Sequence, residues 1–116
     1  MLTIKRAASA AIFAWLLATS AAALAQSYTI PSDPKATYAV LERGGNGNIR
    51  TITYRRSGPS GQSYSKREYD CNAAKTRYLG TGDTMEAMKG SKPEPSRYGI
   101  VDGSIASYLG GLACNK

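Results

Sequence analysis

The sequence predicts an α+β protein: a small antiparallel meander sheet of about four strands, with one C-terminal helix packed on it and tied by a disulfide. Three observations predict this fold. Short alternating or β-branched runs are separated by glycine-containing turns, which favours antiparallel hairpins. An amphipathic segment follows near the C-terminus. The two cysteines, Cys71 and Cys114, stand at the end of one predicted strand and at the end of that segment.

Residues 1–25 have the order of charge, apolar run and small residues that is typical of a secretory signal peptide. Lys5-Arg6 precedes an almost wholly apolar run, residues 7–23, and Ala23-Leu24-Ala25 offers a cleavage site. The alternative is an N-terminal membrane anchor, since a membrane span needs roughly 20 apolar residues. No cysteine lies near the cleavage site to accept a lipid. We therefore expect an exported chain, periplasmic or secreted to the cell surface, that is not lipid-anchored and has no transmembrane segment once mature.

Removal of the signal peptide leaves a small chain with few large apolar residues. The formal charge falls from +7 to +5, because Lys5 and Arg6 leave without an acidic residue. Such a domain buries only about 60–65% of its unfolded surface, so a covalent crosslink would compensate for a thin core. We expect residues 26–37 to form an extended N-terminal lead-in and residues 38–116 to form a single disulfide-stapled domain.

In an exported chain, Cys71 and Cys114 allow one intramolecular disulfide. On the chain-entropy model, closing the loop between Cys71 and Cys114 destabilises the unfolded state by about 4 kcal/mol. That is comparable to the net stability of a small domain. Two free thiols or an intermolecular bridge are the alternatives.

The predicted elements begin after a lead-in whose Pro31 and Pro34 exclude a regular helix. Residues 38–43 alternate as a first strand, and the GGNG turn at 44–47 contains an Asn-Gly pair typical of a type I′ hairpin. The β-branched run 49–56 is the predicted second strand. It argues against a phosphate-binding loop, because such a loop opens a helix.

A turn at 57–61 leads to the predicted third strand, Ser63 to Cys71. Its alternation divides the strand into two sides, Ser65, Arg67, Tyr69 and Cys71 on one and Tyr64, Lys66, Glu68 and Asp70 on the other. Because Cys71 must face the element with which it pairs, we expect Tyr69 in the core beside it. We expect the other side to face solvent.

A tight turn at 72–75 and a fourth strand, 76–80, complete the predicted meander. Residues 82–90 (GDTMEAMKG) fit either one helical turn, with Asp83 and Glu86 at capping-box spacing, or an irregular strand edge. Residues 91–98 contain two prolines and are predicted as a loop.

The C-terminal segment predicts a helix with Ser104 as its N-cap. One apolar stripe contains Ile105, Tyr108, Leu109 and Leu112. So short a helix, with two glycines, is marginal alone and needs the sheet. A continued helix would place Cys114 opposite the stripe, so we expect the helix to end near Leu112.

The mature chain contains no histidine, which removes the usual general base, the usual metal ligand and the Ser-His or Cys-His pairs. With both cysteines in a disulfide, no thiolate remains. The carboxylates have the pattern of an ordinary sheet surface, and no calcium-loop motif occurs. We therefore expect no enzyme activity, no catalytic residue, no cofactor and no metal.

The positive charge is the feature that indicates a partner. Basic and tyrosine residues on two neighbouring predicted strands form our candidate binding face: Arg50, Tyr54, Arg55, Arg56, Tyr64, Lys66 and Arg67. Such a face suits a protein or an anionic polysaccharide or lipid surface. The alternative is that these charges only blunt exposed strands against aggregation. We expect no nucleic acid partner, since the chain is exported and carries no nucleic-acid-binding motif.

Short motifs extend over the second half of the chain: Glu68-Tyr69-Asp70-Cys71, Arg77-Tyr78, Gly80-Thr81-Gly82, and Gly103-Ser104-Ile105 before Cys114. Together they resemble the small bacterial surface-adhesin protein E-like domain family over residues 49–114. The resemblance implies a bridge between Cys71 and Cys114, a Gram-negative envelope location and a binding role; it implies no ligand-binding residue. Two departures are the missing lipid-anchor cysteine and the missing tryptophan and proline before the final helix.

These observations predict a non-enzymatic exported envelope protein, a binding module that contacts an extracellular protein or polyanion. The alternative is a periplasmic accessory or inhibitor protein whose partner is another envelope protein. Binding that requires the basic residues would favour the first function. A periplasmic partner that co-purifies irrespective of these charges would favour the second.

Overall fold

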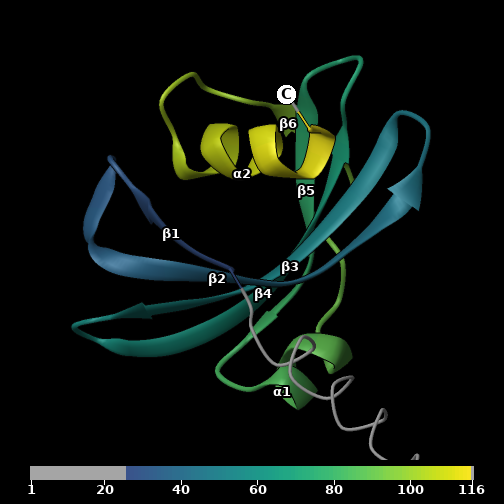
Figure 1. The fold of residues 1–116 in the computed structure, drawn as a ribbon. Helices are drawn as coiled ribbons and strands as arrows, with labels where there is room; N and C mark the ends of the chain where they lie inside the picture. Colours follow the sequence, from purple (N-terminus) through teal and green to yellow (C-terminus); the bar gives the residue numbers. More distant parts are fainter. Residues whose placement is uncertain (1–25, 116) are drawn as a thin grey trace, which may run out of the picture.

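The computed structural model describes residues 26–115, which form one curved antiparallel sheet with a helix on each face (Figure 1). The predicted signal peptide, residues 1–25, lies outside the described residues. Six strands follow one another across the sheet in chain order: β1 (Gln26–Ile30), β2 (Asp33–Asn46), β3 (Ile49–Gly58), β4 (Gly61–Asp70), β5 (Lys75–Gly82) and β6 (Tyr98–Gly99). The helices are α1 (Met85–Gly90) and α2 (Ile105–Cys114). The predicted α+β class, antiparallel meander, C-terminal helix and disulfide are confirmed.

The predicted number of strands, about four, is wrong, because two further segments pair at the edges of the six-stranded sheet. Residues 26–37, the predicted lead-in, form β1, the turn after it and the start of β2. Pro31 lies in the turn between these strands and Pro34 near the start of β2, where a missing N–H disturbs the ladder least. The short β6 pairs with residues 75–76 of β5.

The hairpin between β2 and β3 forms where it was predicted, but its turn is one residue further along. Asn46 pairs with Ile49, so Gly47 and Asn48 are the two central residues. Gly47 has a φ of 59°, whereas Asn48 is not among the positive-φ residues. A type I′ turn needs positive φ at both central positions, so the predicted type I′ turn does not form.

The predicted alternation of β4 is confirmed on the side that faces α2. Ser65, Arg67 and Tyr69 are buried there. With them the core contains residues from four strands and the helix: Ile30, Ala36, Tyr38, Val40, Ile52, Tyr54, Tyr69, Leu109 and Ala113.

The prediction that the other side of β4 faces solvent is wrong, because the residues on that side are half-buried. Helix α1 packs on this face against β5 and β4 (Figure 1). Residues 82–90 therefore include a helix, and its N-cap is Thr84, whose side chain accepts from the Ala87 N–H, rather than Asp83. A side chain at Gly80 would collide with the Met88 backbone, so the close approach of α1 requires glycine there.

Helix α2 begins at the predicted N-cap, Ser104, whose Oγ accepts from the Ser107 N–H at 3.0 Å. Its buried residues are Leu109, Gly110 and Ala113, while Tyr108 of the predicted stripe is 38% exposed. The helix is thus rotated from the predicted orientation.

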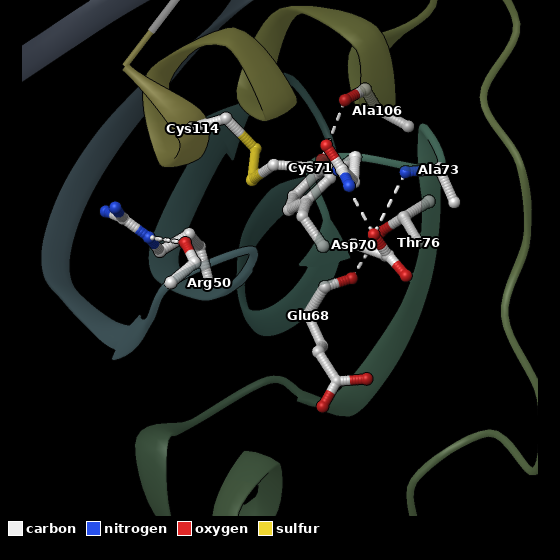
Figure 2. Close-up of a disulfide and its surroundings, with 11 residues drawn as sticks. Arg50, Glu68, Asp70, Cys71, Ala73, Thr76, Ala106 and Cys114 are labelled. Atoms are coloured by element: carbon white, nitrogen blue, oxygen red, sulfur yellow. Dashed lines mark hydrogen bonds between the residues drawn. A yellow bond between two sulfur atoms is a disulfide. The ribbon is translucent and has the colours of Figure 1, made fainter.

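Gly110 explains the rotation, because a Cβ at this position would lie 2.8 Å from the Tyr69 ring. In a helix, residues four apart share a face, so Cys114 lies on the same side as Gly110. The helix can therefore continue through Cys114, and the predicted end near Leu112 is wrong. Figure 2 shows Cys114 bonded to Cys71, with their Cα atoms 5.8 Å apart.

We predict opposite effects for the same substitution at the two adjacent glycines of α2. Gly110→Ala adds a Cβ against the fully buried Tyr69 ring, and overpacking of this kind costs about 1–3 kcal/mol. In Gly111→Ala the added Cβ meets no atom of the described residues within 4 Å, and the helix gains up to about 1 kcal/mol of propensity. Urea unfolding of the disulfide-bonded protein should show a lower midpoint for Gly110→Ala and a higher one for Gly111→Ala. Equal midpoints for the two variants would contradict the packing of Gly110 on Tyr69.

Candidate functional site

The seven residues of the candidate binding face lie on both faces of the sheet, because successive residues of a strand point to opposite sides. The β3–β4 register pairs Tyr54 with Ser65 on one face and Arg55 with Tyr64 on the other. The α2 face carries Arg50, Tyr54, Arg56 and Arg67, and the α1 face carries Arg55, Tyr64 and Lys66. The structure therefore does not bring the seven together on one surface.

Arg67 is a buried cation, with only 5% of its surface exposed. Its Nε donates to the Tyr54 hydroxyl at 3.3 Å, its Nη1 to the Tyr98 hydroxyl at 3.3 Å and its Nη2 to the Tyr78 hydroxyl at 2.8 Å. Its Cζ also lies 4.0 Å from the centroid of the Tyr78 ring. A buried charge is costly unless it is paired, and no carboxylate among residues 26–115 pairs with this one.

An irregularity in the sheet brings Tyr78 to Arg67. Lys66 pairs with Gly80, but the next residue, Arg67, pairs with Tyr78, so Leu79 is an extra residue on β5. Bulges of this kind redirect side chains. Here the bulge places a tyrosine opposite Arg67 on the α2 face.

Arg56 lies near Arg67 but has its own counter-ion. Its Nε and Nη2 donate to the two carboxylate oxygens of Asp33 at 2.8 and 3.2 Å, and the Tyr38 hydroxyl donates to Asp33 at 2.6 Å. These hydrogen bonds, from Arg56 first and then Tyr38, hold the pKa of Asp33 below its usual range. Burial, together with the bond to Asp33, raises the pKa of Tyr38 to about 12. Arg56 is thus neutralised, whereas Arg67 is not.

The two arginines border a cavity of about 150 Å³ on the α2 face of the sheet. We call it the arginine–tyrosine pocket, and it is lined by Tyr38, Tyr54, Arg56, Ser63, Ser65, Arg67, Tyr78 and Ile105. The lining is rich in hydrogen-bond donors. The nearby carboxylate, Asp33, already accepts from Arg56 and Tyr38.

The chemistry of this lining suits an anion. Three of the five N–H groups of the Arg67 guanidinium donate to tyrosine hydroxyls. The other two N–H groups remain to donate to a ligand. Tyr54 and Tyr78 accept from Arg67 and so keep their own O–H groups to donate. Burial raises the pKa of the Tyr54 phenol well above its usual range, so this phenol is a neutral donor and not a base. The pocket can therefore bind a negatively charged group.

The remaining predicted residues lie apart from this pocket. Arg55, Tyr64 and Lys66 are half-buried on the α1 face. The Nε of Arg55 is buried without a hydrogen-bond partner in the part of the chain that is described. Arg50, on the α2 face, donates from Nε to the Gly47 carbonyl at 2.8 Å, within its own hairpin (Figure 2).

The predicted binding face does not include five residues that line the pocket: Tyr38, Ser63, Ser65, Tyr78 and Ile105. Nor does it include Tyr98, which accepts from Arg67, or Asp33, which accepts from Arg56 and Tyr38. One signal was present in the sequence. The alternation of β4 places Arg67 on the same side as Tyr69 and Cys71, and a charged residue on the core side of a strand indicates either a buried network or a ligand site.

The segment that carries Tyr98 is fastened to the sheet by an ionic network on the α1 face. Arg77 of β5 and Arg97 both donate to the same oxygen of Glu68, at 2.9 and 2.8 Å. Arg77 also donates to the Glu94 carbonyl at 2.9 Å. Partial burial acts to raise the pKa of Glu68, but the bonds from the two arginines outweigh it and hold the pKa below its usual range.

Between residues 26 and 115, no group of three or more His, Cys, Asp or Glu side chains is placed to hold a metal ion. In the same range, no helix is long and apolar enough to cross a bilayer.

No family model matches this chain, and neither a curated protein nor a solved structure matches it. The resemblance to the surface-adhesin protein E-like family stays a prediction.

We predict that Glu68 contributes to acid sensitivity. A lowered pKa means that folding favours the ionised carboxylate, so its stabilisation is present at neutral pH and is lost as pH falls through the lowered pKa. Urea unfolding at pH 7 and pH 3 should therefore show a smaller loss of stability in Glu68→Gln than in the unmodified protein. Glu42→Gln is the matched control, because Glu42 is exposed and forms no ion pair with any residue from 26 to 115. An unchanged pH dependence in Glu68→Gln would contradict this role.

Proposed function

We propose that this protein is a non-enzymatic exported binding module of a Gram-negative envelope, which contacts an acidic group of an extracellular protein or polyanion through the arginine–tyrosine pocket. The observation that carries the proposal is Arg67, a 95% buried cation held by neutral hydroxyls beside an open cavity. Burying a guanidinium without a counter-ion costs several kcal/mol. An acidic ligand would recover part of that cost, because it would supply the missing negative charge.

The disulfide supports the proposed location. Disulfides form and persist in oxidising compartments such as the periplasm and the cell exterior. Cys71 and Cys114 are joined, and no described cysteine is free. The signal peptide expected at residues 1–25 would deliver the chain to such a compartment.

The chemistry of the pocket supports binding rather than catalysis. Its ionisable groups are arginines and tyrosines. Burial raises the pKa of Tyr54 and of Tyr38, so both phenols are protonated donors at neutral pH. A general base or nucleophile needs a pKa near the working pH, which the Tyr54 and Tyr38 phenols lack. Arg67 and the Tyr54 phenol are well suited to hold an anion through charge-assisted hydrogen bonds, whereas Tyr38 and Arg56 already donate to Asp33.

The resemblance to surface-adhesin protein E-like domains points to the same class of function. The residues that carry it build the scaffold: Tyr69 is in the core, Cys71 forms the disulfide and Ser104 caps α2. The resemblance therefore supports a binding role on this scaffold, while the pocket supplies the site.

The proposal predicts that acidic polymers bind and that Arg67 carries the interaction. The exported, disulfide-bonded protein should bind immobilised poly-L-glutamate or dextran sulfate, with an affinity that falls as salt rises. Arg67→Gln should weaken binding about tenfold or more, since hydrogen bonds to charged groups contribute about 1.5–3 kcal/mol. Biolayer interferometry would measure both.

Arg55→Gln is the matched control, because it removes the same charge from the opposite face and should change the affinity less than about twofold. Equal losses in the two variants would show that diffuse surface charge, and not the pocket, binds the polymer. If the protein bound neither polymer in a salt-sensitive way, the proposed function would be refuted.

A further inference from the structure

We infer that the arginine–tyrosine pocket takes one carboxylate group, supplied either by a free carboxylic acid or by an acidic residue or C-terminus at the surface of a protein. This inference rests on the proposed function and narrows its ligand from anions in general to a single, singly charged, planar group.

The charge of the pocket calls for one negative charge. Arg56 and Arg67 are the charged residues of the lining. Arg56 is neutralised by the bidentate contact with Asp33, so the net charge left over is that of Arg67. A carboxylate balances it. A phosphate monoester carries about −1.5 to −2 at neutral pH and would leave surplus negative charge beside the one cation of the lining that has no counter-ion in residues 26–115.

The structure already contains a carboxylate bound by the same kinds of groups. Asp33 accepts from the guanidinium of Arg56 at 2.8 and 3.2 Å and from the phenol of Tyr38 at 2.6 Å. Arg67 and its tyrosines, Tyr54 and Tyr78, offer a second guanidinium with phenols beside it, but without a carboxylate from the described chain. We take the Asp33 contact as an internal precedent for the ligand that Arg67 receives.

The size of the pocket limits the ligand to a small group. Its volume of about 150 Å³ is well below the roughly 300–1,000 Å³ of sites that enclose a drug-sized molecule. A side-chain carboxylate with one or two methylenes can enter, whereas a length of polymer backbone cannot. Ile105, at the start of α2, supplies an apolar wall for the methylenes, and Ser63 and Ser65 supply hydroxyls.

The test is an NMR titration of the exported, isotopically labelled, disulfide-bonded protein with four probes at equal ionic strength and pH 7. The probes are propionate, a blocked glutamate peptide (acetyl-Glu-amide), inorganic phosphate and sulfate. We expect saturable shifts of the Arg67 Nε–H and of the Ser65 and Tyr78 amides with the two carboxylates, at least tenfold tighter than with phosphate or sulfate. Tighter binding of the glutamate peptide than of propionate assigns the carboxylate to a protein, and equal binding assigns it to a free acid.

A comparison of the variants Ser63→Leu and Ser57→Leu shows whether the carboxylate binds in the pocket. Ser63 lines the pocket, so leucine there fills it without changing the charge, and carboxylate binding should weaken at least tenfold. Ser57 is also half-buried but lies on the α1 face of β3, so its variant should bind within twofold of the unmodified protein. Unimpaired binding by a folded Ser63→Leu variant would overturn the inference.

The NMR titration of the unmodified protein tests the inference even if the Ser63→Leu variant fails to fold. Phosphate or sulfate that shifts the same resonances with equal affinity would overturn the carboxylate assignment and leave the proposed function standing. The absence of saturable shifts at Arg67 with any probe would overturn the inference as well. Polymer binding that still required Arg67 would then leave the proposed function standing. Polymer binding that did not require Arg67, or no polymer binding at all, would mean that the proposed function fails too.

Discussion

The packing of α2 on Tyr69 is the contact on which the rest of this structure depends. Tyr69 is 1% exposed, its ring lies against Gly110, and its hydroxyl donates to the Ala106 carbonyl at 2.7 Å. Two residues further along the chain, Cys71 joins the C-terminal end of the same helix through the disulfide. One strand end is therefore held to two turns of α2 by packing, a hydrogen bond and a covalent bond. Without α2, the curved sheet would expose the core face that its strands share.

The composition of that core connects stability with the proposed site. Beyond residue 25 the chain contains no phenylalanine or tryptophan, so every buried aromatic ring brings a hydroxyl into the interior. Buried hydroxyls need partners. Tyr69 finds a helix carbonyl and Tyr38 finds Asp33, while Tyr54 and Tyr78 share the guanidinium of Arg67. A buried arginine is thus both a partner for the tyrosines and a charge that can attract a ligand.

The two faces of the sheet have different roles as a result. On the α1 face, Glu68 joins Arg77 and Arg97 and fastens the segment that leads to β6. On the α2 face, that segment presents Tyr98 to Arg67. The carboxylate network on one face therefore helps to position the Tyr98 hydroxyl that accepts from Arg67 on the other.

Local sequence alone determined the strands from 38 to 80, the Ser104 cap, the burial side of β4 and, with the count of cysteines, the disulfide. These follow from a period of two residues, from glycine-containing turns and from a single available pairing. Tertiary contacts decided which stripe of α2 is buried, because the space at Gly110 is set by a ring 41 positions away in the sequence. They also decided the edge strands, the bulge at Leu79 and the tyrosines around Arg67, one of them 31 residues distant. Alternation could place Arg67 on the core side of its strand, but only the register of neighbouring strands and the path of a distant loop could choose its partners.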